Sequence, residues 1–152
     1  MLKKILYLIL VLNFLPSCGY TPMYSSGKLV KFSIDEIIIN GDWELNNFIK
    51  NSLERYSSKE EAKKYKIIIN TNYTENAISR DAAGKTTKYQ FIIDADIELI
   101  SEDFNKKYSF KESFTMENFN DELDKTNYEK SNKNNISNII VNKLVLQISR
   151  LE

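Results

Sequence analysis

Tyr89-Gln90-Phe91-Ile92-Ile93-Asp94-Ala95-Asp96-Ile97-Glu98-Leu99 is the stretch that decides the fold of this chain of 152 residues. Every odd-numbered residue in it is aromatic or aliphatic, and the residues between them are mostly polar or acidic. Successive side chains of a β-strand point to opposite faces, so this alternation predicts a long strand with one buried face and one wet face.

The same alternation occurs on both sides of this stretch. Residues 65–73 alternate before it and residues 108–116 alternate after it. Between the first two runs lies a polar tip, residues 79–85, which contains Gly84. Residues 102–106 form the next turn. Three alternating runs joined by short polar turns predict an antiparallel meander.

A further strand and a helix precede the meander. Residues 29–40 are rich in β-branched side chains and end at Asn40-Gly41, a turn signal, which predicts the first strand. Asp42 is then placed to cap a helix. Apolar residues recur behind it at helical spacing and predict one amphipathic helix: Leu45, Phe48, Ile49, Leu53 and Tyr56.

The C-terminal part predicts a loop followed by a second helix. Residues 117–133 are acidic and rich in amides, which favours a long loop whose first part could be helical, with Asn132 or Asn135 as the cap of the last element. Apolar residues then recur about once per helical turn: Ile136, Ile140, Leu144, Ile148 and Leu151.

The order β-α-β-β-β-α predicts an α+β fold. Two amphipathic helices and a sheet with one apolar face bury each other most simply as a two-layer sandwich, with both helices packed on one face of a four-stranded mixed sheet. The other sheet face is expected to stay wet. A single domain over residues 29–152 is expected, because about 135 residues suffice for one core.

The N-terminus predicts export and lipidation. Lys3 and Lys4 precede the apolar residues 5–15, a run about half the length of a membrane span, and Leu15-Pro16-Ser17-Cys18-Gly19 follows. The lone cysteine lies where a bacterial lipobox places its lipidated thiol; the alternative is a plain secretory signal. We expect residues 1–17 to be a removed signal peptide, Cys18 to be acylated and residues 18–28 to be a tether. Gly19 instead of Asp favours the outer membrane.

Composition excludes several classes of function. Without residues 1–17, 19 basic residues face 21 acidic ones, and this balance argues against nucleic acid as a partner. The chain has no histidine and a single cysteine, so the commonest general base, metal ligand and disulfide are missing. The sequence contains no glycine-rich phosphate loop or nucleophile elbow. No cofactor or metal is expected.

Two groups of side chains could carry chemistry. Asp94, Asp96 and Glu98 share one strand face and could bind a cation or serve a hydrolase, but without companion ligands a solvated strand face is the favoured interpretation. Tyr108, Phe110 and Phe114 form either an aromatic docking surface or, as their spacing favours, part of the core.

Three basic residues gather at the tip between the second and third strands. Arg80, Lys85 and Lys88 could hold phosphate groups through charge-assisted hydrogen bonds. Asp81 lies among them, and an ordinary solvated loop is the alternative.

Several of these segments together resemble a known family. Cys18-Gly19-Tyr20-Thr21-Pro22-Met23-Tyr24 resembles the mature N-terminus of the lipopolysaccharide-assembly lipoproteins of the LptE type. The tip at residues 79–89, the strands at 95–99 and 108–114, and an amide-rich loop before a C-terminal helix are also similar to that family. Its members often carry arginine where Lys88 stands. Lysine keeps the positive charge at this position but lacks the two parallel N–H donors with which a guanidinium binds phosphate.

The resemblance implies a carrier and assembly role with no catalysis. Such proteins are outer-membrane lipoproteins with two helices on a four-stranded sheet. They plug an LptD-type β-barrel, help it assemble and can bind lipopolysaccharide. By this resemblance the partners are that barrel, lipopolysaccharide and the membrane, with Arg80, Lys85 and Lys88 facing lipid phosphates. A lipoprotein adaptor or pilot of another envelope assembly is the first alternative, and a periplasmic hydrolase using Asp94 or Glu98 is the second.

Overall fold

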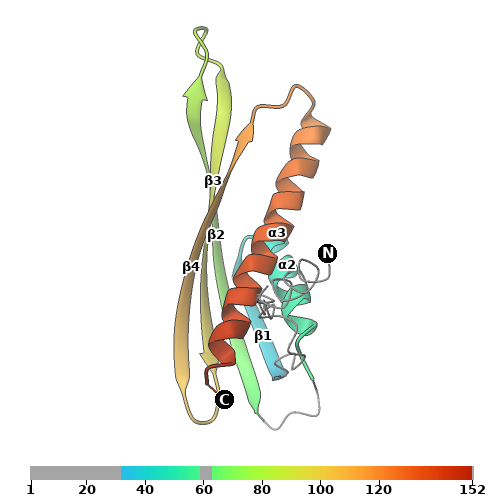
Figure 1. Cartoon of the computed structure of the whole chain (residues 1–152), viewed down its shortest axis with the longest axis vertical. Helices are drawn as coiled ribbons and strands as arrows, with labels where there is room; N and C mark the ends of the chain where they lie inside the picture. The colour runs from blue at the N-terminus through green and yellow to red at the C-terminus, as the bar shows by residue number, and fades with distance from the viewer. Residues whose placement is uncertain (1–31, 59–62, 152) are drawn as a thin grey trace, which may run out of the picture.

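The fold is known from a computed structural model that describes residues 32–58 and 63–151. Two helices and a four-stranded sheet alternate along the chain in the order β-α-β-β-β-α (Figure 1). The elements are β1 (Ser33–Gly41), α2 (Trp43–Glu54), β2 (Lys64–Arg80), β3 (Thr86–Ile100), β4 (Asn105–Glu117) and α3 (Glu122–Ile148).

The sheet is mixed and its spatial order follows the sequence. β1 pairs with β2 in parallel, and β2, β3 and β4 form an antiparallel meander, giving the order β1-β2-β3-β4. The parallel pair requires a crossover connection, which α2 supplies. Both helices lie on the same side of the sheet (Figure 1). The predicted α+β class, the element order and the mixed sheet are therefore confirmed.

The core lies between the helices and the predicted apolar sheet face. Alternate side chains of β2 and β3 are fully buried against the apolar stripes of α2 and α3, as period-two and helical patterns require. The buried side chains with no exposed area include Tyr65, Ile67, Ile69, Ile93, Leu99, Leu45, Ile49, Leu53, Ile140, Leu144 and Ile148. The opposite sheet face carries no helix (Figure 1).

The turn from β1 into α2 is set by a local cap and by a close approach to β2. Gly41 has φ +101°, and a Cβ there would lie 1.8 Å from the carbonyl oxygen of Thr71, so only glycine fits. Asp42 caps α2 as predicted, because its carboxylate accepts a hydrogen bond from the Leu45 amide at 2.8 Å. Asn46 fastens the first turn by donating its amide to the carbonyl of Asn40.

The start of the last helix was predicted wrongly. Residues 117–133 were expected to form a long loop, but α3 begins at Glu122 and runs for 27 residues. Asp121 is its cap, accepting from the Leu123 amide at 2.7 Å, and neither Asn132 nor Asn135 serves that role. Acidic residues in the first turn of α3 favour this start, because they complement the positive end of the helix dipole.

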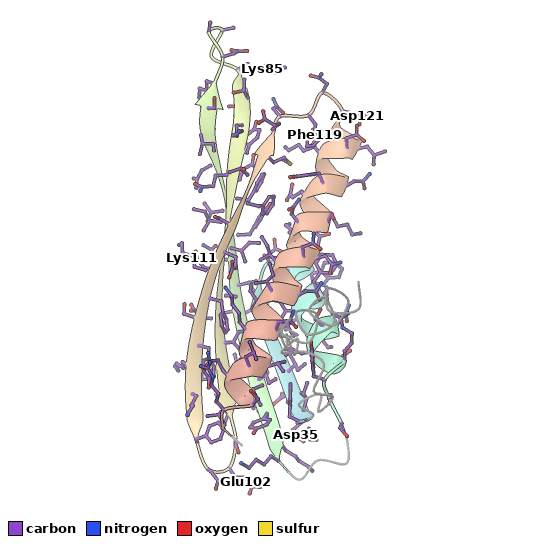
Figure 2. All side chains as sticks on the ribbon, viewed as in Figure 1. Asp35, Lys85, Glu102, Lys111, Phe119 and Asp121 are labelled. Carbon is purple, nitrogen blue, oxygen red and sulfur yellow. The ribbon has the colours of Figure 1, made fainter. Side chains whose placement is uncertain are left out.

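The β2–β3 hairpin projects beyond the rest of the sheet. The ladder between β3 and β4 ends at the Lys88–Glu117 pair, while β2 and β3 remain paired up to Arg80 and Thr86. The two strands therefore continue as a free ribbon past the end of β4 (Figure 1). Figure 2 shows Lys85 on this ribbon and Glu102 at the opposite end of the molecule.

The expected signal peptide at residues 1–17, Cys18 and the tether at residues 18–28 lie outside the described residues. Neither described helix has the length and hydropathy needed to span a membrane.

Candidate functional site

The tip of the hairpin is an ordered turn built around Asp81. Its carboxylate accepts hydrogen bonds from the amides of Ala83 and Lys85, both at 2.9 Å. Gly84, at φ +80°, permits the reversal, and open space surrounds the position of its missing Cβ. Asp81 is therefore occupied in holding the turn, and the tip does not depend on a ligand for its shape.

The three basic residues predicted at the tip are in different electrostatic states. The guanidinium of Arg80 donates to the carbonyl of Gly84 at 3.1 Å, so part of it serves the turn. Lys88 forms an ion pair with Glu117 of β4 at 2.9 Å. Lys85 is exposed, and its ammonium contacts no other described side chain closely enough for an ion pair. Lys85 is thus the cation of the three that is free to meet an anion.

The acidic row of β3 is largely matched by β4. Asp94 pairs with Lys111 at 2.9 Å, and Glu98 pairs with Lys107 at 3.6 Å. Asp96 lies between them in register with Ser109, without an ion pair to any described residue. Asp96 and Glu98 border an open cleft that Asn70 and Lys107 also line, whereas a hydrolase would need its carboxylates in a deep pocket. Asp94 and Glu98, the two carboxylates of the hydrolase alternative, are both engaged in ion pairs with β4.

The described residues contain no group of three or more acidic, histidine or cysteine side chains that could hold a metal ion. The acidic row on β3 therefore does not form the cation site that was considered from the sequence.

The aromatic residues of β4 belong to the helix-covered side. Tyr108, Phe110 and Phe114 are partly buried against the core, as their spacing favoured. Phe114 stacks on Phe91 at 4.8 Å between ring centroids, and Phe91 stacks on Tyr73 at 5.5 Å. This row of rings continues the apolar layer under the N-terminal half of α3.

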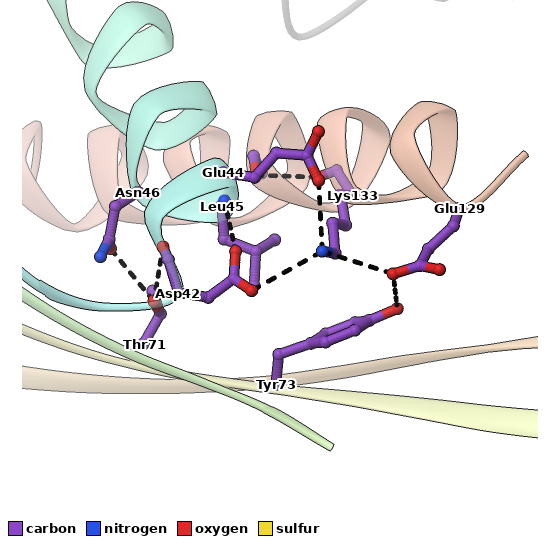
Figure 3. Close-up of polar contacts among 9 residues, drawn as sticks. Asp42, Glu44, Leu45, Asn46, Thr71, Tyr73, Glu129 and Lys133 are labelled. Carbon is purple, nitrogen blue, oxygen red and sulfur yellow. Dashed lines mark hydrogen bonds and ion pairs between the residues drawn. The ribbon is translucent and has the colours of Figure 1, made fainter. Parts of the chain in front are cut away.

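A buried charge cluster, which the sequence did not reveal, joins α2, α3 and β2 (Figure 3). The ammonium of Lys133 lies 3.2 Å from Glu44, 3.4 Å from Glu129 and 3.6 Å from Asp42, and the Lys133 side chain is only 8% exposed. Its Nζ also lies 4.2 Å from the centre of the Tyr73 ring. We call these five residues the Lys133 cluster.

The cluster changes the proton affinity of two of its members. Burial, together with the hydrogen bond that the Tyr73 hydroxyl donates to Glu129 at 2.9 Å, raises the pKa of the phenol far above its usual range. Burial by itself would lower the pKa of Lys133, but the charges of Asp42, Glu44 and Glu129 outweigh it and raise that pKa. Lys133 is therefore firmly charged and Tyr73 firmly neutral at physiological pH.

One local signal could have indicated this cluster. Glu129 and Lys133 are four residues apart, the spacing of a stabilising pair on a helix. The i, i+4 spacing brings two side chains together only on a helix, so it gave no signal while residues 117–133 were expected to be a loop.

Comparison with solved structures places the fold among bacterial lipoproteins. Rare lipoprotein B from Shewanella oneidensis matches with TM-score 0.55 and 9% identity, over 77% of this chain and 98% of that chain. A minor lipoprotein from Acinetobacter baumannii matches with TM-score 0.51 and 11% identity, over 74% and 93%. The solution structure of lipoprotein B from Nitrosomonas europaea matches with TM-score 0.51 and 12% identity, over 82% and 88%.

No family model and no curated protein sequence matches the chain. The similarity is thus one of fold, and it extends over nearly the whole of the Shewanella domain. The fold implied by the sequence resemblance is confirmed: the described domain has the architecture of rare lipoprotein B, the LptE family.

Proposed function

We propose that this chain is an outer-membrane lipoprotein that plugs an LptD-type β-barrel translocon, helps it assemble and contacts the lipopolysaccharide that the barrel delivers. The observation that carries the proposal is the fold match, which covers 77% of this chain and 98% of rare lipoprotein B. The Cys18 motif adds the lipid anchor. Two or more acyl chains would hold the protein stably at the membrane, where one would not.

The bare sheet face supports this role. Besides Ile38, Ile68 and Ile92, this face carries polar groups and ion pairs, including Glu36–Lys66 at 2.7 Å and Asp94–Lys111 at 2.9 Å. The lumen of an outer-membrane barrel is likewise polar. Most charges on this face are matched, with Asp96 as an exception, so the face can enter such a lumen with few unpaired charges against the wall.

The proposal is tested by purifying the tagged, lipidated protein from detergent-solubilised envelopes and identifying its partners by mass spectrometry. Recovery of one large outer-membrane barrel is expected. Recovery of a secretin or another envelope assembly in its place would favour the adaptor alternative and contradict the plug. A Cys18→Ser variant is the control for the anchor, and it should remain outside the membrane fraction.

Lipopolysaccharide contact at the tip is tested separately by charge reversal. Arg80→Glu and Lys85→Glu are expected to weaken binding of purified lipopolysaccharide more than Lys88→Glu does, because Glu117 already neutralises Lys88. Glu117→Gln should strengthen binding by releasing that lysine. Lys106→Glu, on β4, is the matched control. Unchanged binding in the triple reversal at the tip would remove the tip from the mechanism.

A further inference from the structure

Trp43 is the largest apolar side chain that the described structure leaves in water. It is the only tryptophan of the chain, and it is 76% exposed at the first position of α2. Tryptophan contributes 150–250 Å² of contact area when buried and is strongly enriched among the residues that dominate protein interfaces. Isolated exposed apolar side chains are ordinary on protein surfaces, so the position of Trp43 matters as well as its exposure.

The residues around Trp43 hold it in a fixed place. Gly41 forces the chain into a close approach to Thr71, and the Asp42 carboxylate caps the helix at 2.8 Å from the Leu45 amide. Glu44, the next residue, is tied to Lys133 at 3.2 Å. An anchor mounted on so constrained a turn loses little conformational freedom when it binds.

The surroundings of Trp43 are acidic. Asp42 and Glu44 flank it in the sequence, and Glu129 lies on the far side of their shared lysine (Figure 3). These three carboxylates face a single ammonium, so the Lys133 cluster carries two surplus negative charges. The carboxylates of Asp42, Glu44 and Glu129 are 23%, 33% and 24% exposed, so the surplus charge of the cluster is not sealed from solvent.

We propose that Trp43 anchors a docking surface for a protein partner that presents a basic side chain beside an apolar one. The inference rests on the proposed function, in which that partner is the barrel. An arginine or lysine of the partner would find both a ring face and surplus negative charge here. Lipid phosphates would meet that charge with the wrong sign, so this surface takes protein, and it is distinct from the basic tip.

The first experiment measures the association of full-length variants with the barrel that co-purifies with the wild type. Trp43→Ala is expected to weaken the complex on the order of 30-fold, the effect of losing a dominant interface residue. Trp43→Phe should retain most of the affinity, because an aromatic face remains. Leu146→Ala is the matched control, since Leu146 is also an exposed helical residue, 47% accessible, outside the Lys133 cluster.

The outcomes separate this inference from the proposed function. If the wild type recovers no barrel, the proposed function fails and the barrel assignment of Trp43 fails with it. If the wild type and Trp43→Ala recover the barrel equally well, the proposed function stands and the Trp43 inference is overturned. Circular dichroism of each variant shows whether a loss of binding reflects unfolding.

A second experiment uses the single tryptophan as its own reporter. The emission maximum of the full-length protein is recorded with vesicles containing phosphatidylglycerol and, separately, with purified lipopolysaccharide. We expect no blue shift in either case. A blue shift with either lipid would mean that Trp43 enters a lipid environment, and would overturn the assignment to a protein partner.

Discussion

Replacing Lys133 with methionine tests whether the Lys133 cluster stabilises the fold. Methionine keeps most of the apolar stem but removes the charge, and it leaves Asp42, Glu44 and Glu129 facing one another with no cation between them. Removing one partner from a buried ion pair costs about 3–5 kcal/mol. These carboxylates are between a quarter and a third exposed, so water offsets part of the cost, and about 3 kcal/mol is expected.

The corresponding fall in melting temperature follows from the size of the domain. At about 2.1 cal/mol/K per residue, a domain of about 120 residues has an unfolding entropy near 0.25 kcal/mol/K, so 3 kcal/mol corresponds to roughly 12 °C. The assay is thermal and urea unfolding followed by far-ultraviolet circular dichroism. Tryptophan fluorescence is a poor probe here because Trp43 is already exposed in the folded protein.

Two controls make the test specific. Lys130→Met, three residues earlier on α3 and exposed, should change stability by no more than about 0.5 kcal/mol. Glu129→Gln should destabilise the wild type, because it weakens a pair with Lys133, but should stabilise Lys133→Met, because it removes a repelling charge. The reasoning is refuted if Lys133→Met and Lys130→Met unfold alike, or if Glu129→Gln has the same sign in both backgrounds.

Two further predictions follow from the backbone and from the titration of the cluster. Gly41→Ala should destabilise the protein by several kcal/mol in urea unfolding, since its Cβ would overlap the Thr71 carbonyl, whereas Gly84→Ala, with open space around it, should cost about 1 kcal/mol. Because the pKa values of Tyr73 and Lys133 are raised in the folded state, the stability that they contribute is complete below about pH 10 and is lost as the pH rises further. Tyr73→Phe should therefore lessen the fall in unfolding free energy between pH 10 and 12, by at most about 1.4 kcal/mol per pH unit, and an unchanged slope would contradict the assignment.

Local signals were sufficient for the parts of the fold that neighbouring residues determine. The cap at Asp42 acts over three residues, and the alternation in β3 is a property of that strand alone. Such features can be predicted from the sequence because the residues that interact, or that alternate, are close together in it. Asn40-Gly41 was readable as a turn signal, although the clash that demands glycine there involves the distant Thr71.

The parts that sequence reasoning missed depend on distant segments. The N-terminal half of α3 is polar, so its composition favoured a loop, yet Lys133 binds it to α2 through residues almost ninety positions earlier. The end of β2 shows no alternation because residues 75–80 are exposed on both faces of the free ribbon. Its strand conformation is maintained by pairing with β3, which no local pattern reports.

At the basic tip, the positive charge counted from the sequence is larger than the positive charge that remains unpaired in the structure. Three cations within nine residues suggested one phosphate site, but Glu117, which neutralises Lys88, comes from a strand 29 residues further on. Beside Trp43 the surplus negative charge comes from its sequence neighbours Asp42 and Glu44, while the distant α3 supplies Glu129 and Lys133, whose charges cancel. If both surfaces act as proposed, their opposite signs keep their ligands separate: lipid phosphates are attracted to the tip and repelled from Trp43. The order of effects among the tip variants and the emission of Trp43 with lipid test the two halves of this division independently.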